Sequence, residues 1–262
     1  MILLVFLAGL LLIPYLVFGS FFFETFWRTN WPLVVIWALI FISFNIFYFT
    51  NRQLFMLLEK EDWPALVVFL EDKVISKGNY SPRLVRLLAN CFLVLSDSAA
   101  VINLENKVAI SKPALINTNA LVFGTARILR GDISGAVRFF DSRKGIVKPG
   151  IKEWMYWYSG FSLLLDRQFE KAAEEFTLLV QESRDSLITG LSSYFLCENL
   201  SFMLIDKMDE LREIASLGRK KVLKAIPKIE AWKKEVYRFS TEIHVAVISQ
   251  YIEETGRWLF QE

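Results

Sequence analysis

The sequence predicts an all-α protein, in which an N-terminal hairpin of two transmembrane helices (1–52) precedes an α-helical repeat domain (53–262). Two observations predict this fold: charge is nearly absent from the first segment, and small and large apolar residues recur at a fixed spacing in the second. Residues 1–52 carry only Glu24, Arg28 and Arg52, although the whole chain has 30 basic and 28 acidic residues. This asymmetry excludes a fully soluble protein and a disordered chain, and the presence of only two cysteines excludes a disulfide scaffold.

Two stretches of 23 uncharged residues, beginning at Met1 and Thr29, predict the membrane hairpin. About 20 apolar residues suffice for a helix to cross the ~30 Å hydrocarbon core of a bilayer. Leu, Ile, Val and Phe dominate both stretches. We therefore place two spans at about 2–20 and 32–50 and expect a short aromatic-rich loop at 20–30 to join them.

The flanking residues bear on the ends and orientation of these spans. No Gly or Pro occurs between Pro32 and Pro64, so we expect the second helix to run on through Leu58. No basic residue precedes the first apolar stretch, which disfavours cleavage as a signal peptide. Arg52 and Lys60 favour a multi-pass protein of the cell membrane whose main domain is cytoplasmic.

A periodic pattern follows the membrane segment. Four alanines recur at intervals of 35, 36 and 36 residues, and a large apolar residue lies four positions after each of them. A glycine lies twelve positions before each of the last two alanines. The four-residue spacing places both side chains on one helix face, and the glycine lets a second helix cross closely. Helical hairpins are therefore predicted, most clearly at about 119–145 and 153–181. The signature residues are Ala65, Phe69, Ala100, Leu104, Gly124, Ala136, Phe140, Gly160, Ala172 and Phe176.

The second of these hairpins resembles the tetratricopeptide repeat family. The positions that the family gives to an aromatic residue, glycine, tyrosine, alanine and an aromatic residue are taken by Tyr156, Gly160, Phe169, Ala172 and Phe176. The preceding hairpin matches at Gly124, Gly131, Ala136 and Phe140. The resemblance implies a solenoid of stacked hairpins with a concave, protein-binding surface. The alternative is an all-α bundle without regular stacking.

The first helices of the hairpins are expected to line that concave surface. Candidate partner-binding residues there are Arg127, Trp154, Trp157, Phe161 and Tyr194. The last helix, at about 228–254, carries an apolar stripe and is expected to cap the solenoid; alternatively, it lies in the concave groove.

A basic cluster lies near the C-terminus. Eight basic residues at 219–238 are opposed only by Glu230 and Glu235, which leaves a local net charge of +6. A solvated surface, contact with anionic lipid and docking of an acidic protein all remain open. Nucleic acid is disfavoured because no reading motif is present. The candidate residues are Arg219, Lys220, Lys221, Lys224, Lys228, Lys233 and Lys234.

Residues suited to catalysis are scarce. His244 is the only histidine and lies between apolar neighbours, and Cys91 and Cys197 lie in apolar helical runs, so all three are predicted to pack in the core. No catalytic, cofactor-binding or metal-binding motif occurs. We therefore predict a non-catalytic, membrane-anchored scaffold or adaptor that binds the bilayer and unidentified proteins. The alternative is a fixed structural subunit of a larger membrane or envelope complex, such as a secretion, motility or assembly machine.

Overall fold

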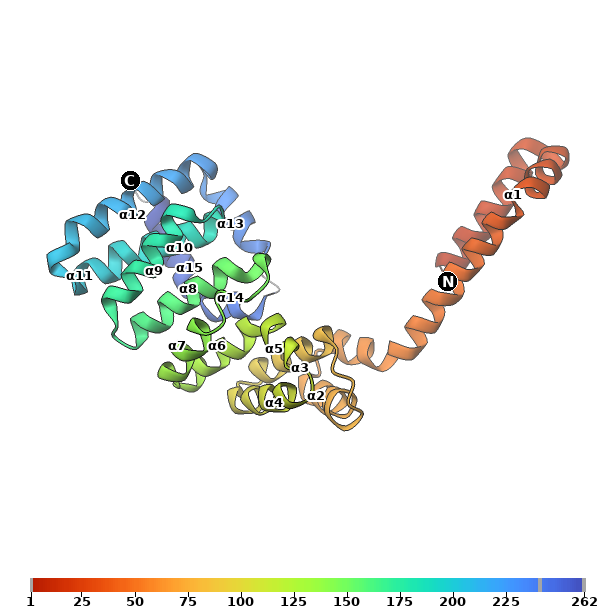
Figure 1. The fold of residues 1–262 in the computed structure, drawn as a ribbon. Coiled ribbons are helices and arrows are strands. Elements are labelled where there is room, and N and C mark those ends of the chain that lie inside the picture. The colour runs from red at the N-terminus through yellow and green to blue at the C-terminus, as the bar shows by residue number, and fades with distance from the viewer. Residues whose placement is uncertain (1, 240–241, 261–262) are drawn as a thin grey trace. The chain divides into compact units, whose positions relative to one another are not determined.

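The computed structural model describes residues 2–239 and 242–260, and their side chains except those at 2–15, 18, 20–27, 29 and 34. Every regular element in this part of the chain is a helix, which confirms the all-α class (Figure 1). The chain divides into two compact units, Met1–Asp62 and Trp63–Glu262. Each unit is described by itself.

The helical stretch of the first unit, α1 (Ile2–Glu59), is two helices that meet at a kink at Gly19, where φ is 77° and ψ is 175°. The expected loop at 20–30 is helical, because no proline or further glycine interrupts the chain there. Among the described residues, one helical segment, Asn30–Glu59, is long and apolar enough to cross a membrane. One candidate span is therefore found in place of the predicted hairpin of two, and the first predicted span, at about 2–20, lies mostly outside the residues whose side chains are described. The predicted continuation through Leu58 is confirmed.

The second unit is built from short helices that pair along the chain. Asp97, Asp132 and Asp185 begin three of them, since each carboxylate accepts a hydrogen bond from a backbone N–H in the first turn. Gly131 ends another helix in the left-handed conformation, with φ 81°. The helices are α2 (Trp63–Glu71), α3 (Pro82–Val94), α4 (Ser98–Ser111), α5 (Ala114–Thr118), α6 (Ala120–Arg130), α7 (Ile133–Asp141), α8 (Pro149–Leu165), α9 (Phe169–Glu182), α10 (Ser186–Phe195), α11 (Ser201–Met203), α12 (Met208–Ala225), α13 (Ile229–Tyr237), α14 (Ile243–Val247) and α15 (Ser249–Phe260), with π-helical turns at Asp72–Ser76 and Leu196–Leu200 and a 3-10 turn at Ile205–Lys207.

Two glycines of the predicted signature lie where paired helices approach closely. A Cβ atom on Gly124 of α6 would lie 2.2 Å from Cζ of Phe140 on α7. A Cβ atom on Gly160 of α8 would lie 3.0 Å from Cε1 of Phe176 on α9. Both phenylalanines are fully buried. The spacing of sixteen residues from glycine to phenylalanine thus reflects the crossing of two helices, with the ring of the second lying on the backbone of the first.

The C-terminal segment packs against the helices that precede it. Its helix α14 contacts α6, and α15 contacts α10 (Figure 1). The segment predicted to be one helix at 228–254 contains α13, α14 and the start of α15 instead. The helix is interrupted at His244, because its carbonyl accepts a hydrogen bond from the hydroxyl of buried Tyr158 (2.6 Å). The Ile248 N–H, which would bond to His244 in a continuous helix, donates to the carbonyl of Val245 instead.

Candidate functional site: a basic face and a polar cavity

The residues predicted to form a partner surface make contacts within the unit instead. Trp154, Trp157 and Phe161 of α8 are each at most 5% exposed. Phe161 contacts Tyr251 of α15, with ring centroids 5.6 Å apart, and Trp154 contacts His244 at 5.1 Å. The C-terminal helices therefore cover this side of α8, so it is not an open surface.

The other two candidate residues also have internal partners. Arg127 forms an ion pair with Glu105, which is 6% exposed, and its guanidinium lies 4.4 Å from the ring centroid of Phe139. The Tyr194 hydroxyl donates a hydrogen bond to Glu254 on α15 (3.0 Å). Both residues thus join helices of the domain, and neither is a free contact residue.

The basic cluster separates into two groups. Arg219 donates two hydrogen bonds to the carbonyl of Leu259, and Lys221 donates to the carbonyls of Val180 and Ser183 at the end of α9. These two side chains cap backbone carbonyls, as cations near helix C-termini commonly do. The remaining lysines are exposed and, within the described part of the chain, form no ion pair with an acidic residue. We call these five the basic face: Lys220, Lys224, Lys228, Lys233 and Lys234.

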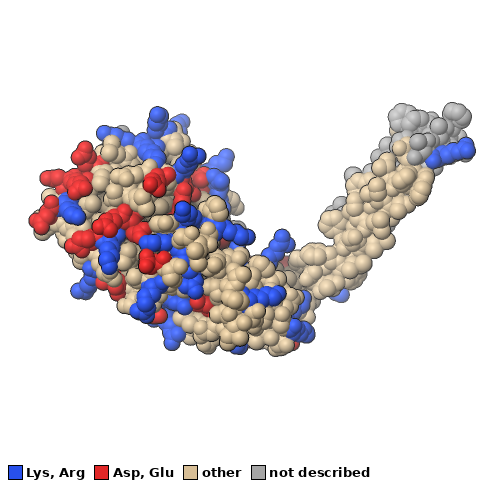
Figure 2. All heavy atoms as spheres, viewed as in Figure 1, with Lys and Arg blue, Asp and Glu red and all other residues tan. Residues whose placement is uncertain are grey.

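Charge is distributed unevenly over the molecule. In Figure 2, blue and red side chains alternate over the second unit, whereas the drawn surface of the first unit is almost free of them. The local net charge of +6 at 219–238 thus belongs to a domain that is otherwise mixed in charge. Because its exposed lysines form no ion pair in the described chain and outnumber Glu230 and Glu235, the basic face presents a net positive potential to solvent.

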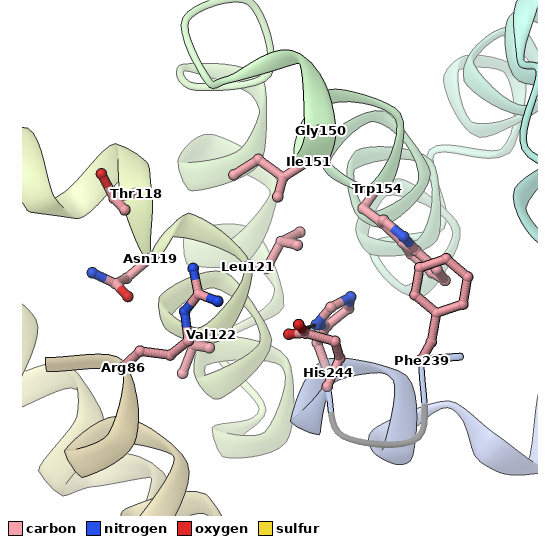
Figure 3. A pocket seen from close by; sticks show the side chains of 11 residues that line it. Arg86, Thr118, Asn119, Leu121, Val122, Gly150, Ile151, Trp154, Phe239 and His244 are labelled. Atoms are coloured by element: carbon pink, nitrogen blue, oxygen red, sulfur yellow. Dashed lines mark ion pairs between the residues drawn. The ribbon is translucent and has the colours of Figure 1, made fainter. Parts of the chain in front are cut away.

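A small cavity lies between α3, α6, α8 and the C-terminal segment (Figure 3). Its volume is about 110 Å³. Arg86, Asn119, Glu242 and His244 provide its polar groups. Leu121, Val122, Ile151, Trp154 and Phe239 are among its apolar walls. We call it the polar cavity. Arg86 and Gly150 are exposed, so the cavity reaches the surface beside them.

Two buried polar atoms of this cavity have no hydrogen-bond partner in the described part of the chain. They are Oδ1 of Asn119, a residue 2% exposed, and Nε2 of His244, which is 4% exposed. The Asn119 amide nitrogen is used, because it donates to the carbonyl of Leu115 (3.0 Å). In Figure 3 the side chains of Arg86, Asn119 and His244 come from three separate helical segments, and the Arg86 guanidinium lies between Asn119 and His244. An unmet buried acceptor is costly, so these atoms require a partner from solvent or from a ligand.

Burial controls the charge of the histidine. Desolvation, with a smaller contribution from the positive charge of Arg86, lowers the pKa of His244 to about 4, so its imidazole is neutral at pH 7. Its Nδ1 lies 3.9 Å from a carboxylate oxygen of Glu242. That proximity favours the tautomer with its proton on Nδ1, which leaves Nε2 as an acceptor.

The same residues offer little reactive chemistry. Within 2–239 and 242–260 no group of three His, Cys, Asp or Glu side chains could hold a metal ion. The Cys91 thiol is buried, and burial raises its pKa to about 11; burial also raises the pKa of half-buried Cys197. Thiols with raised pKa values are poor nucleophiles, because the thiolate is the reactive form.

Comparison with known proteins gives the chain its family. The model of a family described as "Uncharacterised Treponema protein" matches residues 100–261. The chain belongs to this family. An uncharacterised protein of Treponema pallidum (strain Nichols) is 29% identical over 232 residues, which cover 86% of this chain and 74% of the relative. The match to this Treponema family includes Asn119, Trp154, Glu242 and His244 of the polar cavity but not Arg86.

Membership of this Treponema family corrects the resemblance to tetratricopeptide repeats. The family model spans both of the best hairpins, and no tetratricopeptide family is matched. Glycine, alanine and phenylalanine at these spacings are what any closely crossing helix pair requires, so the pattern is not specific to that family. Sequence reasoning also missed the polar cavity, because Arg86, Asn119 and Glu242 lie far apart in the chain and no motif connects them.

Proposed function

We propose that this protein is a non-catalytic, membrane-attached adaptor whose basic face binds an acidic surface of another protein. The membrane part of the proposal rests on Asn30–Glu59. Large apolar side chains such as Leu39, Phe44, Phe47 and Phe49 are more than half exposed along it. Removing such surface from water is strongly favourable, and a bilayer provides the environment to do so.

The observation that supports the partner is the unneutralised basic face. Five exposed lysines outnumber the two nearby acidic residues, Glu230 and Glu235, and form no ion pair with them in the described chain, so an acidic partner would relieve their mutual repulsion as well as speed association. The side of α8 that sequence reasoning chose for binding is covered by α14 and α15. A partner that leaves the fold intact must therefore use an outer surface.

Membrane attachment is tested by alkaline extraction of native membranes. A helix that crosses the bilayer keeps the full-length chain in the pellet at high pH, with residues 30–59 still present by mass spectrometry. Release into the supernatant, or a mature chain lacking these residues, would contradict attachment through this helix.

Partner binding is tested with a zero-length carbodiimide crosslinker, which joins lysine amines only to carboxylates in direct contact. In native membranes we expect adducts at the basic face, and we expect a variant with all five lysines changed to glutamine to lose them. A matched variant with exposed Lys107, Lys152 and Lys171 changed to glutamine should keep them. Adducts in both variants, or binding of the purified chain to phosphatidylglycerol vesicles without any protein adduct, would refute an acidic protein partner.

A further inference from the structure

The polar cavity has features of a ligand site that the adaptor function does not use. Three acceptors border it: Oδ1 of Asn119, Nε2 of His244 in the tautomer favoured by Glu242, and the Glu242 carboxylate itself. One cation, the guanidinium of Arg86, borders it as well, and this residue forms no ion pair within the described chain.

These groups define complementary chemistry. The Glu242 carboxylate and the His244 acceptor match an ammonium group, which has N–H donors and a positive charge. A guanidinium matches a carboxylate, which it can bind with two parallel hydrogen bonds. We propose that the polar cavity binds a small zwitterionic α-amino acid, with its ammonium toward Glu242 and His244 and its carboxylate toward Arg86.

The size of the cavity limits the ligand. A volume of about 110 Å³ is well below the roughly 300–1,000 Å³ of sites for larger ligands. The apolar walls from Leu121, Val122 and Ile151 provide no further charge. The ligand is therefore small, of the size of glycine or alanine. Buried Asn119 and His244 support this reading, because their unpartnered atoms are inside the fold, where satisfying them has the greatest effect.

The test uses the full-length chain in detergent and equilibrium dialysis with radiolabelled glycine. We expect saturable binding of one glycine per chain. Arg86→Gln and Glu242→Gln should each weaken it about tenfold or more, since each removes a charged hydrogen-bonding partner. Arg83→Gln on α3 and Glu253→Gln on α15 change exposed residues of the same charge outside the cavity and should leave the affinity unchanged.

Direct contact is read from the imidazole nitrogens by NMR, because His244 is the only histidine. Glycine should shift the Nε2 resonance, whereas acetate and methylammonium, each carrying half of the zwitterion, should compete at least tenfold more weakly than glycine. Absence of saturable binding would mean that the cavity holds only water. Equal competition by either half-ligand, or unchanged affinity in both cavity variants, would overturn the proposal as well.

Discussion

Gly124→Ala is expected to destabilise the second unit, although alanine favours helix formation. The added Cβ would lie 2.2 Å, 2.5 Å and 2.8 Å from three ring carbons of Phe140. That ring cannot withdraw, because it is fully buried and stacked on Tyr158 with centroids 5.5 Å apart. Overpacking of this kind costs about 1–3 kcal/mol, or more, and the better helix propensity returns about 1 kcal/mol. The net loss is therefore roughly 0–2 kcal/mol, and the closeness of the contact places it toward the upper end of that range.

The measurement is urea unfolding of the full-length chain in detergent, followed by tryptophan fluorescence, since Trp154 and Trp157 lie beside this contact. Gly150→Ala is the matched control, because a Cβ there has nothing within 4 Å. Phe140→Leu removes the clashing ring atoms. The loss of stability in the double variant should therefore be at least about 1 kcal/mol smaller than the sum of the losses in the two single variants. A Gly124→Ala chain as stable as the Gly150→Ala chain would refute the close crossing of α6 and α7.

Three further changes test other contacts. Tyr158→Phe removes the donor to the His244 carbonyl and should cost about 1–3 kcal/mol in the same unfolding assay, whereas exposed Tyr237→Phe should cost nothing measurable. The pKa of His244 is about 4 in the folded chain and 6.5 in the unfolded chain, so the unfolded chain binds more protons between these pH values. The free energy of unfolding should therefore fall by roughly 3 kcal/mol as pH drops from 6.5 to 4. A pH-independent free energy of unfolding, or the same slope in His244→Asn, would contradict this. Lys221→Ala should cost about 1–2 kcal/mol through the lost bonds to the end of α9, and equal stability of Lys221→Ala and Lys220→Ala would contradict that role.

Local features of the fold could be read from the sequence, and its long-range arrangement could not. The Gly124 and Gly160 spacing identified the crossing helices because helix geometry fixes which residues share a face. The same reasoning placed Trp157 and Phe161 on one face of α8, but sequence spacing does not say whether solvent, a partner or the chain's own C-terminus covers that face. Tyr251 covers part of it, ninety residues after Phe161.

The charged residues show the same division. Counting lysines located the basic cluster, yet only coordinates reveal that Lys221 caps backbone carbonyls while Lys220 remains exposed. The polar cavity was invisible for a related reason, since Arg86 and Asn119 reach it from α3 and the start of α6, and His244 from far along the chain. His244 was correctly predicted to be buried, but its apolar neighbours in sequence gave no sign of the polar groups around its ring.

Acetylation rates of individual lysines, measured by mass spectrometry, test the adaptor account most directly. They should be compared between the purified chain in detergent and the chain in its native membranes, with Lys107 of α4 as the internal reference. The account predicts that Lys220, Lys224, Lys228, Lys233 and Lys234 react readily in the purified chain and become at least several-fold slower in native membranes, while Lys107 does not change. Equal rates for these five lysines in both preparations would contradict a partner on the basic face.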